Sequence, residues 1–321
     1  MKILITPLLV LCCFCGNLAL AQEWPTRAVK LVVPYPAGGG VDVMARALAQ
    51  RLQDKWQQPV TVDNRPGANT LLGTEAVARA TDHHTLLFTT DATFTINPHL
   101  YKKLPYDLDR DFQPITQLVS FSQMLVVNGD LPVNSLQELL ALAKAKPGSL
   151  SYASYGPGSQ PQLATEMLKQ KAGVFIVHIP YRGIPQAVTA VVSNEVPMTW
   201  SGIVSARAHL ASKRIKALAY GGKTRAAAYP QVPTVAELGF PEVDANVWVG
   251  LFAPTGLSSA GVNKIHRDVM SVLTDADFRT REIEGKSYDF AGLGPEEFKK
   301  HIRQESQSRK LTLQTSGATL E

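Results

Sequence analysis

The stretch VKLVVPYPAGGGVDVMARALAQRLQDKW (29–56) decides the fold class of this chain. Its β-branched start, Val29 to Val33, is typical of a buried strand that ends at Pro34. A glycine-rich bend follows, after which Met44, Leu48 and Leu52 recur at the spacing of one helix face. A strand, a tight bend and an amphipathic helix in this order are the first half of a β–α–β unit.

The same alternation continues along the 321 residues. Ser135 and Glu138 form a capping box, which predicts the start of a further helix. Helices are also expected up to residue 79, at 258–274 and at 295–310. Further strand-like runs lie at 60–62, 85–90, 123–128, 151–155, 173–179, 196–200, 214–220 and 246–254. The alternation predicts an α/β architecture with largely parallel sheets, and the length favours two domains.

Composition narrows the class of protein. The chain is 45% hydrophobic and 18% charged, which is typical of a globular protein and excludes a disordered or polytopic membrane protein. The net charge is +5, but no run of five Lys or Arg residues occurs, so nucleic acid is not a predicted partner. Beyond the N-terminal leader, no segment reaches 18 apolar residues, so the mature protein is not expected to be embedded in a membrane.

The first 21 residues are predicted to be a cleaved signal peptide. Lys2 is followed by an apolar core at 3–15 and by the small-x-small sequence Ala19-Leu20-Ala21. All 3 cysteines lie in this leader, so the mature chain has no disulfide or thiolate chemistry. A lipoprotein attached through Cys15 is the alternative, and the bulky Phe14 before that cysteine argues against it. The predicted location is the bacterial periplasm.

Glycine-rich turns at strand ends carry the candidate chemistry. YPAGGGVD (35–42) and SYGPGSQPQ (154–162) each lie between a predicted strand and a predicted helix, one in each half of the chain. Backbone amides in such a bend, together with the positive end of the following helix, attract a carboxylate or phosphate. NRPGAN (64–69) and TTDAT (89–93) follow other strands of the first half. Any single turn of this kind is also compatible with a purely structural role.

Motifs for other chemistries fail when they are compared residue by residue. The dinucleotide-binding pattern meets Val43 where its third glycine belongs, and the phosphate-binding loop pattern before Gly222 meets Ala217. Pro161 replaces the second glycine of a hydrolase nucleophile turn. The His83-His84 pair has no third ligand at suitable spacing. We therefore predict no catalytic residues, no metal site and no cofactor.

Seven motifs, in this order, resemble the Bug family, the periplasmic receptors associated with tripartite tricarboxylate transporters. They are YPAGGGVDVMAR (35–46), VDNRPGA (62–68), INPHLY (96–101), SYGPGS (154–159), HIPYRG (178–183), VPTVAELG (232–239) and GLFAPTG (250–256). The resemblance implies a two-lobed periplasmic binding protein fold, type II-like, with two hinge strands near 122–127 and 248–252. The lobes would be 22–123 with 250–321, and 124–249.

The resemblance also implies how such a receptor holds its ligand. A ligand carboxylate would lie on the first loop, at Tyr35, Ala37, Gly38 and Gly39. The opposing lobe would offer Gly156, Gly158, Ser159, Gln160, Tyr181 and Gly183. Asn69, Thr90 and Asp91, from the two other turns of the first half, complete the predicted set. The family pattern usually has two glycines where this chain has Asn69-Thr70.

Two residues near the first loop keep alternative roles. Asp42 is expected either to cap the helix or to contact ligand, and Arg46, one turn later, is expected to pair with it. We also hypothesise that Asp91 selects a ligand with an ammonium or other donor group beside its carboxylate. The alternative is that Asp91 caps the segment that follows it.

The expected function is that of a monomeric solute receptor. It would capture a small carboxylate (a carboxylic acid, dicarboxylate, amino acid or aromatic acid) between its lobes and deliver it to the membrane permease of a tripartite transporter. The alternatives are an exported enzyme of unknown reaction and a ligand-binding input to a membrane sensor kinase. The sequence leaves the identity of the carboxylate open.

Overall fold

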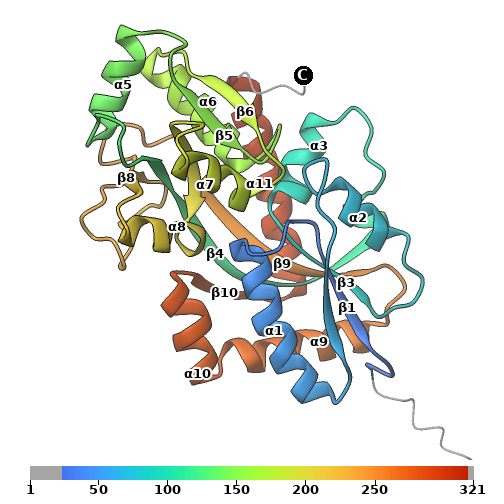
Figure 1. Ribbon diagram of the computed structural model, residues 1–321. Coiled ribbons are helices and arrows are strands. Elements are labelled where there is room, and N and C mark those ends of the chain that lie inside the picture. Colours follow the sequence, from blue (N-terminus) through green and yellow to red (C-terminus); the bar gives the residue numbers. More distant parts are fainter. Residues whose placement is uncertain (1–23, 317–321) are drawn as a thin grey trace, which may run out of the picture.

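The computed structural model describes residues 24–316, so the predicted leader and its cysteines lie outside the described residues. Within that range the chain forms two α/β lobes joined by one curved sheet (Figure 1). The strand order is β2-β1-β3-β9-β4-β7-β5-β6, with β10 and β8 both paired to β4.

The first lobe contains the stretch that decides the fold. Its strands are β1 (Val29–Val33), β2 (Val60–Asn64), β3 (Thr85–Thr90), β9 (Asn246–Pro254) and β10 (Asp289–Leu293). Its helices are α1 (Gly40–Trp56), α2 (Leu71–Ala78), α3 (Asn97–Leu100), α4 (Leu108–Asp111), α9 (Ser259–Leu273), α10 (Ala276–Phe278) and α11 (Pro295–Ser316). Three short helical turns are η1 (Ala92–Ile96), η2 (Arg279–Ile283) and η3 (Glu284–Lys286).

The second lobe repeats the strand–helix alternation. Its strands are β5 (Ser151–Ser154), β6 (Val177–Pro180), β7 (Met198–Gly202) and β8 (Ile215–Tyr220). Its helices are α5 (Leu136–Ala145), α6 (Gln160–Ala172), α7 (Ile184–Val192) and α8 (Ile203–Ala211). The predicted capping box is confirmed, because Ser135 accepts the backbone N–H of Glu138 at the start of α5.

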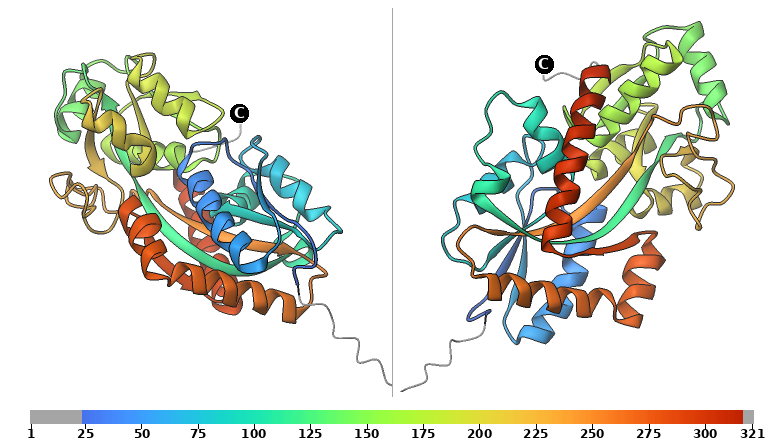
Figure 2. Two further views of the ribbon diagram at one scale, coloured as in Figure 1. Left: turned by 60° about the horizontal axis from the view of Figure 1, so that its bottom comes forward. Right: turned by 180° about the vertical axis from the view of Figure 1, so that it is seen from behind.

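Three segments connect the lobes. Strand β4 (Phe112–Asn128) pairs with β9 as far as Ser122 and with β7 from Gln123 onward, so it crosses between the lobes at this point. The chain returns to the first lobe just before β9. Helix α11 crosses behind the sheet and contacts η1, β4 and α6 (Figure 2). The sheet is continuous through β4, so strand pairing marks no border between the lobes. The lobe borders at 123/124 and 249/250 therefore stay a prediction.

The expectation of largely parallel sheets is wrong. β1 pairs in parallel with β2 and β3, and β5 with β6 and β7, but every pairing of β4 and β9 is antiparallel. The reason is topological: the chain leaves the first lobe along β4 and returns along β9, so the two strands run side by side in opposite directions. The sheet is therefore mixed.

Two strand predictions also need correction. The run at 173–179 becomes a strand only from Val177, and Phe175 in its apolar part is 59% exposed. The strand predicted at 123–128 begins 11 residues earlier, at Phe112. Sequence patterning missed this half because polar residues, among them Gln117 and Ser122, interrupt it, and both of these are buried in the structure.

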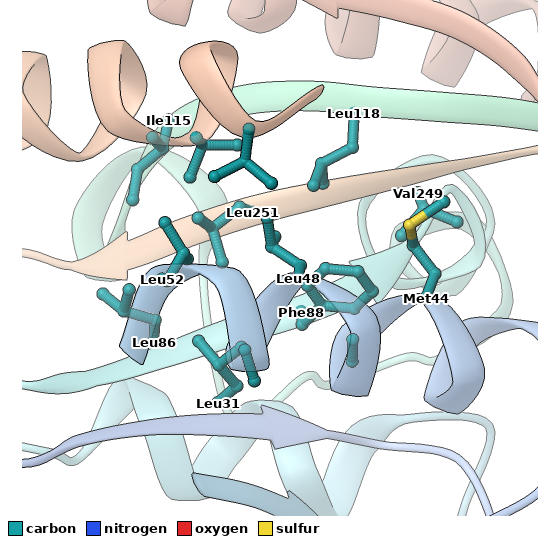
Figure 3. Packing of buried hydrophobic residues seen from close by; sticks show 14 of the residues in the cluster. Leu31, Met44, Leu48, Leu52, Leu86, Phe88, Ile115, Leu118, Val249 and Leu251 are labelled. Carbon is teal, nitrogen blue, oxygen red and sulfur yellow. The ribbon is translucent and has the colours of Figure 1, made fainter. Parts of the chain in front are cut away.

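The core of the first lobe is the helical stripe of α1 packed on the sheet. Met44, Leu48 and Leu52 are at most 1% exposed and lie over Leu31 and Leu251 (Figure 3). Removing a leucine side chain from such a site typically costs about 2–5 kcal/mol. This packing fixes α1, and so it fixes the position of the glycine-rich loop at the start of the helix.

Candidate ligand site between the lobes

The loop before α1 is held by the first turn of that helix. The N–H of Gly38 donates to Asp42 Oδ2 at 2.9 Å, and Asn64 Nδ2 donates to Asp42 Oδ1 at 2.9 Å. The predicted Asp42–Arg46 pair is confirmed, with 3.0 Å between Asp42 Oδ1 and Arg46 Nη2. Burial by itself would raise the pKa of Asp42, but these three hydrogen-bond partners together lower it. Asp42 therefore acts as an anchor for the loop.

The corresponding loop of the second lobe is held in the same way. Gln162, at the same position of α6 as Asp42 in α1, accepts the N–H of Gly158 at 2.6 Å. Ser159 Oγ donates to the carbonyl of Gly156 at 2.6 Å, and the Gly156 N–H donates to Ser154 Oγ at 3.0 Å. Both loops thus use glycine amides internally: that of Gly38 in the first loop, and those of Gly156 and Gly158 in the second.

The two lobes are in contact around these loops. A Cβ placed on Gly183 would lie 2.5 Å from Pro36 Cγ, so only glycine allows this approach of the second lobe to the first. A Cβ on Gly158 would lie 2.0 Å from Leu100 Cδ1. The rings of Tyr35 and Tyr155, one from each lobe, meet edge to face at 6.2 Å.

A first cavity, called the inner cavity, lies between the lobes and is lined by both Tyr35 and Tyr155. Its volume is about 50 Å³, and three helices begin in its wall: α1 at 39–41, α7 at 184–185 and α8 at 202–205. Their N-cap residues are Gly39, Gly183 and Gly202, and none of the three helix starts carries a side-chain cap. The first N–H groups of a helix have no partner within it, so the amides at the starts of α1 and α8 can donate to a bound molecule. Helix α7 offers fewer amides, because Pro185 has no N–H.

Gln123 supplies the second polar feature of the inner cavity. It lies on β4 where the strand crosses between lobes, lines the cavity, and is 2% exposed. Its Oε1 is buried and has no hydrogen-bond partner among the described residues. A buried acceptor without a partner costs about 1–3 kcal/mol, so this atom is a site for a donor from a bound molecule or a water.

A second cavity, called the outer cavity, has a volume of about 440 Å³ and is also lined by Tyr35 and Tyr155. The first lobe contributes the turn at 66–70 to its wall, and the second lobe contributes 155–157, Tyr181 and Arg182. The INPHLY motif positions this turn, because Asn97 Nδ2 donates to the carbonyl of Asn69 at 2.7 Å and Asn97 Oδ1 accepts from Asn69 Nδ2 at 2.7 Å. Tyr181 donates its hydroxyl to Glu195 Oε1 at 2.8 Å.

Asp91 lines neither cavity and is 1% exposed. Its Oδ2 lies 3.7 Å from Arg309 Nη2 on α11, and the same nitrogen is 3.2 Å from Asp244 Oδ2 and 3.1 Å from Glu305 Oε1. Burial raises the pKa of Asp91 to about 8; Glu305 adds to the increase, and Arg309 opposes it. Arg309 is thus the cation nearest to Asp91 among the described residues, and the hypothesis that Asp91 selects a ligand with an ammonium or other donor group stays a prediction. The capping alternative is wrong, since its side chain makes no cap.

The predicted site residues therefore divide into three groups. Tyr35, Gly39 and Thr90 line the inner cavity, and Tyr35, Asn69, Gly156 and Tyr181 line the outer one. Ala37, Gly38, Gly158, Ser159, Gln160, Asp91 and Gly183 line neither.

Outside the two predicted loops, sequence reasoning missed five parts of the inner wall: the start of α8 at 202–205, the start of α7 at 184–185, Phe121 and Gln123 of β4, Val247 of β9, and residues 286–288. A signal existed for the first, because Gly202 separates a strand from a helix as Gly39 does. None existed for residues 286–288, which reach the cavity through tertiary packing.

Other kinds of site find little support in the described residues. Between residues 24 and 316, no three His, Cys, Asp or Glu side chains gather in a way that could hold a metal ion. None of the described helices combines the length and apolarity that crossing a membrane requires.

Known proteins match this chain over most of its length. Residues 44–316 match the model of the family described as "Tripartite tricarboxylate transporter family receptor". Protein BugT of Bordetella pertussis is 36% identical over 255 residues, which cover 79% of this chain and 78% of BugT.

Two solved structures from Rhodopseudomonas palustris have a similar fold. Rpa4515, solved with adipate, has a TM-score of 0.89 and 28% identity, covering 93% of this chain and 100% of that one. MatC, solved with bound malate, has a TM-score of 0.84 and 28% identity, covering 90% of this chain and 100% of that one.

These similarities confirm the two-lobed periplasmic binding protein fold and exclude the exported-enzyme alternative, because the family and its solved members are solute-binding receptors. The chain belongs to the Bug family of tripartite tricarboxylate transporter receptors, and it is a solute-binding receptor.

Proposed function

We propose that this receptor captures a small carboxylate in the inner cavity and delivers it, in the periplasm, to the membrane permease of a tripartite transporter. The carboxylate would accept hydrogen bonds from the helix starts at 39–41 and 203–205, one from each lobe. The observation that carries this proposal is the convergence of three helix starts without side-chain caps on one cavity. The dicarboxylates bound by Rpa4515 and MatC support it.

The hydrogen bonds within the two loops show which of the predicted contact residues still have a free backbone amide for the ligand. The amides of Gly38 and Gly158 already donate to Asp42 and Gln162, so the proposed site does not use them. Gly39, Thr90 and Tyr35 remain in it, and Gln123 joins them. The unpaired Oε1 of Gln123 would receive a donor group of the ligand or a water that bridges to it.

The energies of these contacts suffice for a transport receptor. A charge-assisted hydrogen bond contributes about 1.5–3 kcal/mol, and each helix end adds about 0.3–1 kcal/mol. Four or five such contacts, less the cost of ordering, reach about −8 kcal/mol, which corresponds to micromolar affinity. Because the amides come from both lobes, a ligand gains all of them only in the closed form, and binding therefore favours closure.

Thermal unfolding of the purified mature protein with a panel of small acids tests the binding step. An acid present at 100 times its Kd should stabilise the folded protein by about 2.7 kcal/mol. The amides or methyl esters of the same acids are matched controls, since they lack the negative charge. Stabilisation by the acids alone supports the proposal, and stabilisation by acid and ester alike contradicts it.

Uptake of the labelled acid by cells tests delivery. Cells that carry the permease should lose uptake when the receptor is deleted and regain it when the receptor is restored. If the protein binds the acid but uptake does not depend on it, delivery to the permease is contradicted. The alternative function, a ligand-binding input to a membrane sensor kinase, is then favoured. The exported protein is expected to begin near Gln22 and to be a monomer, which N-terminal sequencing and light scattering check.

A further inference from the structure

Helix α11 lies behind the cleft and contacts both lobes (Figure 2). Its first half is anchored in the first lobe, where Phe298 and Ile302 are at most 1% exposed and belong to a core of that lobe. Its last turns reach the second lobe, because Leu313 packs in one apolar cluster with Ile96 of η1 and Leu163 of α6. A helix that is fixed in one lobe and contacts the other can couple the positions of the two.

Arg309 is the charged side chain that α11 places between the lobes. Its side chain is 6% exposed, and between residues 24 and 316 no other Lys or Arg is buried to this extent. One of its nitrogens, Nη2, lies 3.1 Å from Glu305 Oε1 and 3.2 Å from Asp244 Oδ2, with Asp91 Oδ2 at 3.7 Å. A cation buried this deeply depends on its carboxylates, since a buried charge without a partner is strongly destabilising.

The acids around Arg309 come from both lobes. Glu305 is on α11 itself, and Asp91 directly follows β3 of the first lobe. Asp244 is held by the second lobe, because its two neighbours in the chain are buried in the core of that lobe. The guanidinium therefore joins α11 to a carboxylate of the second lobe. Moving the second lobe away would take this carboxylate from Arg309.

In the second lobe, a short series of contacts leads from Arg309 to the cleft. The backbone carbonyl of Asp244 accepts a hydrogen bond from Gln160 Nε2 at 2.6 Å. The backbone N–H of Gln160, the first residue of α6, donates to the hydroxyl of Tyr155 at 3.4 Å. Gln160 is 1% exposed, so water does not compete for these contacts. Tyr155, which lines both cavities, is thus linked to the residue that Arg309 holds.

In the first lobe, the corresponding series is shorter. Asp91 directly follows Thr90, whose hydroxyl shares a hydrogen bond of 2.7 Å with the hydroxyl of Tyr35. Tyr35 also lines both cavities, and its ring meets that of Tyr155 edge to face at 6.2 Å. Arg309 itself lines neither cavity. It is therefore connected to the tyrosines of both lobes without belonging to the wall of the site.

We propose that Arg309 is a positioning residue for ligand capture. Its ion pair with Asp244 holds the two lobes in the arrangement in which Tyr35 and Tyr155 meet, and opening of the cleft breaks this pair. Part of the free energy that closes the receptor on its ligand then comes from a contact outside the site. The effect on affinity rests on the proposed function, whereas the effect on closure does not.

Distances between two spin labels test the effect on closure without any ligand. The chain has no cysteine after Cys15, so labels can be attached at Gln50→Cys on α1 and Thr189→Cys on α7, two exposed sites in different lobes. In this background, Arg309→Met should reduce the population of the short interlobe distance at least about fivefold. An unchanged distance distribution overturns the proposal, and so does a labelled receptor with Arg309 intact that never shows the short distance.

A second variant keeps the test valid if Arg309→Met does not fold. Asp244→Asn removes the charge of a side chain that is 51% exposed, and it keeps the Oδ1 that accepts the N–H of Asn246 at 2.9 Å. It should reduce the short-distance population about threefold. Glu242→Gln is the matched control, since its side chain is 52% exposed and pairs with Lys171 within the second lobe. Equal effects of the two variants, or no effect of Asp244→Asn, contradict the proposal.

Rescue by a second cation separates the charge from packing. Arg309→Lys keeps the positive charge, although it loses the planar guanidinium. It should restore at least about half of the short-distance population that Arg309→Met loses. A receptor in which Arg309→Lys and Arg309→Met behave alike would show that the ion pair does not join the lobes.

Calorimetric titration with malate, adipate, glutamate and benzoate tests the effect on capture. For the tightest of these acids, Kd should rise about threefold in Asp244→Asn and at least about tenfold in Arg309→Met, with no change in Glu242→Gln. Shifted distances with an unchanged Kd overturn the role of Arg309 in capture and leave the proposed function standing. If the original receptor binds none of the four acids, the proposed function fails, and the distances alone decide whether Arg309 holds the lobes together.

Discussion

Helices that begin at the edge of this protein and helices that begin at the cleft are capped in different ways. At the edge, Ser135 and Ser258 accept a backbone N–H of the helix that follows, and Asp107 and Asp275 do the same with their carboxylates. At the inner cavity, α1, α7 and α8 begin with glycine and have no side-chain cap. Replacing a capping side chain at the N-cap by alanine costs about 0.5–2 kcal/mol of stability. Replacing it by glycine costs only a few tenths of a kcal/mol. The cleft helices thus forgo a small stabilisation, and their amides remain available to a ligand.

Aspartate shows the same contrast at the back of the cleft. Asp91 stands at the start of η1, as Asp107 stands at the start of α4, but its carboxylate is buried and caps nothing. Its nearest cation is Arg309, on the helix that joins the lobes. A carboxylate in this position makes the stability of the fold sensitive to pH.

The largest expected effect is on the pH dependence of stability. Because the pKa of Asp91 is raised to about 8 in the folded state, its proton stabilises the fold below its ordinary pKa and this stabilisation is lost as pH rises toward 8. Between pH 5 and 8 the free energy of unfolding should fall by on the order of 3 kcal/mol relative to Asp91→Asn, which cannot ionise. Urea unfolding of both proteins at several pH values measures this. Parallel curves would show that Asp91 is ionised in the folded protein.

The next effect is on affinity. Ser205 is the third residue of α8 and lines the inner cavity. Ser205→Glu suits the helix, since glutamate at this position favours a helix start, but it places a negative charge beside the ligand carboxylate. Binding should weaken at least about 100-fold, or about 2.7 kcal/mol, by calorimetry. Ala208→Glu, on the exposed side of the same helix, is the matched control, and equal losses in both variants would refute the cavity assignment.

Supplying the absent cap tests the comparison itself. The backbone of Gly39 has φ −77° and ψ 165°, which serine adopts, and an added Cβ meets nothing closer than 3.8 Å. Gly39→Ser should raise stability by a few tenths of a kcal/mol, because its hydroxyl would accept an amide of α1. The same hydroxyl competes with the ligand, so affinity should fall about tenfold, or about 1.4 kcal/mol. A variant that binds as tightly as the original chain would show that these amides do not contact the ligand.

Removing a cap at the edge should have the smallest effect. In contrast to Gly39→Ser, it should lower the stability and leave the affinity for the acid unchanged. Ser135→Ala takes away the acceptor for the Glu138 N–H, which costs about 1 kcal/mol of stability in urea unfolding. The affinity for the acid should stay the same, since α5 does not reach either cavity. A change in Kd would link this edge of the second lobe to the site and remove the distinction between the two sets of helices.

Local patterns in the sequence predicted much of the fold. The strand–bend–helix unit at 29–56 is present as β1 and α1, and the capping box at Ser135 begins α5. Long-range pairing was not predictable in this way. Nothing local to 112–128 shows that this strand passes from one lobe to the other, or that β9 will run beside it in the opposite direction.

The site was predictable only in part, for a physical reason. Glycine bends mark places where the chain turns closely, and both predicted loops lie at the contact between the lobes. The bend alone does not reveal which amides are already used, and Asp42 and Gln162 use those of Gly38 and Gly158. Departures from the family pattern are equally hard to interpret: Asn69 and Thr70 keep the positive φ angles, 45° and 77°, that glycines would adopt there.

A crystal structure of the mature protein with the tightest-binding acid of the panel tests the central claim most directly. The account predicts the carboxylate in the inner cavity, within hydrogen-bond distance of backbone N–H groups at 40–41 and 203–205. A carboxylate found instead in the outer cavity, held by Arg182 or the 156–157 segment, would contradict it.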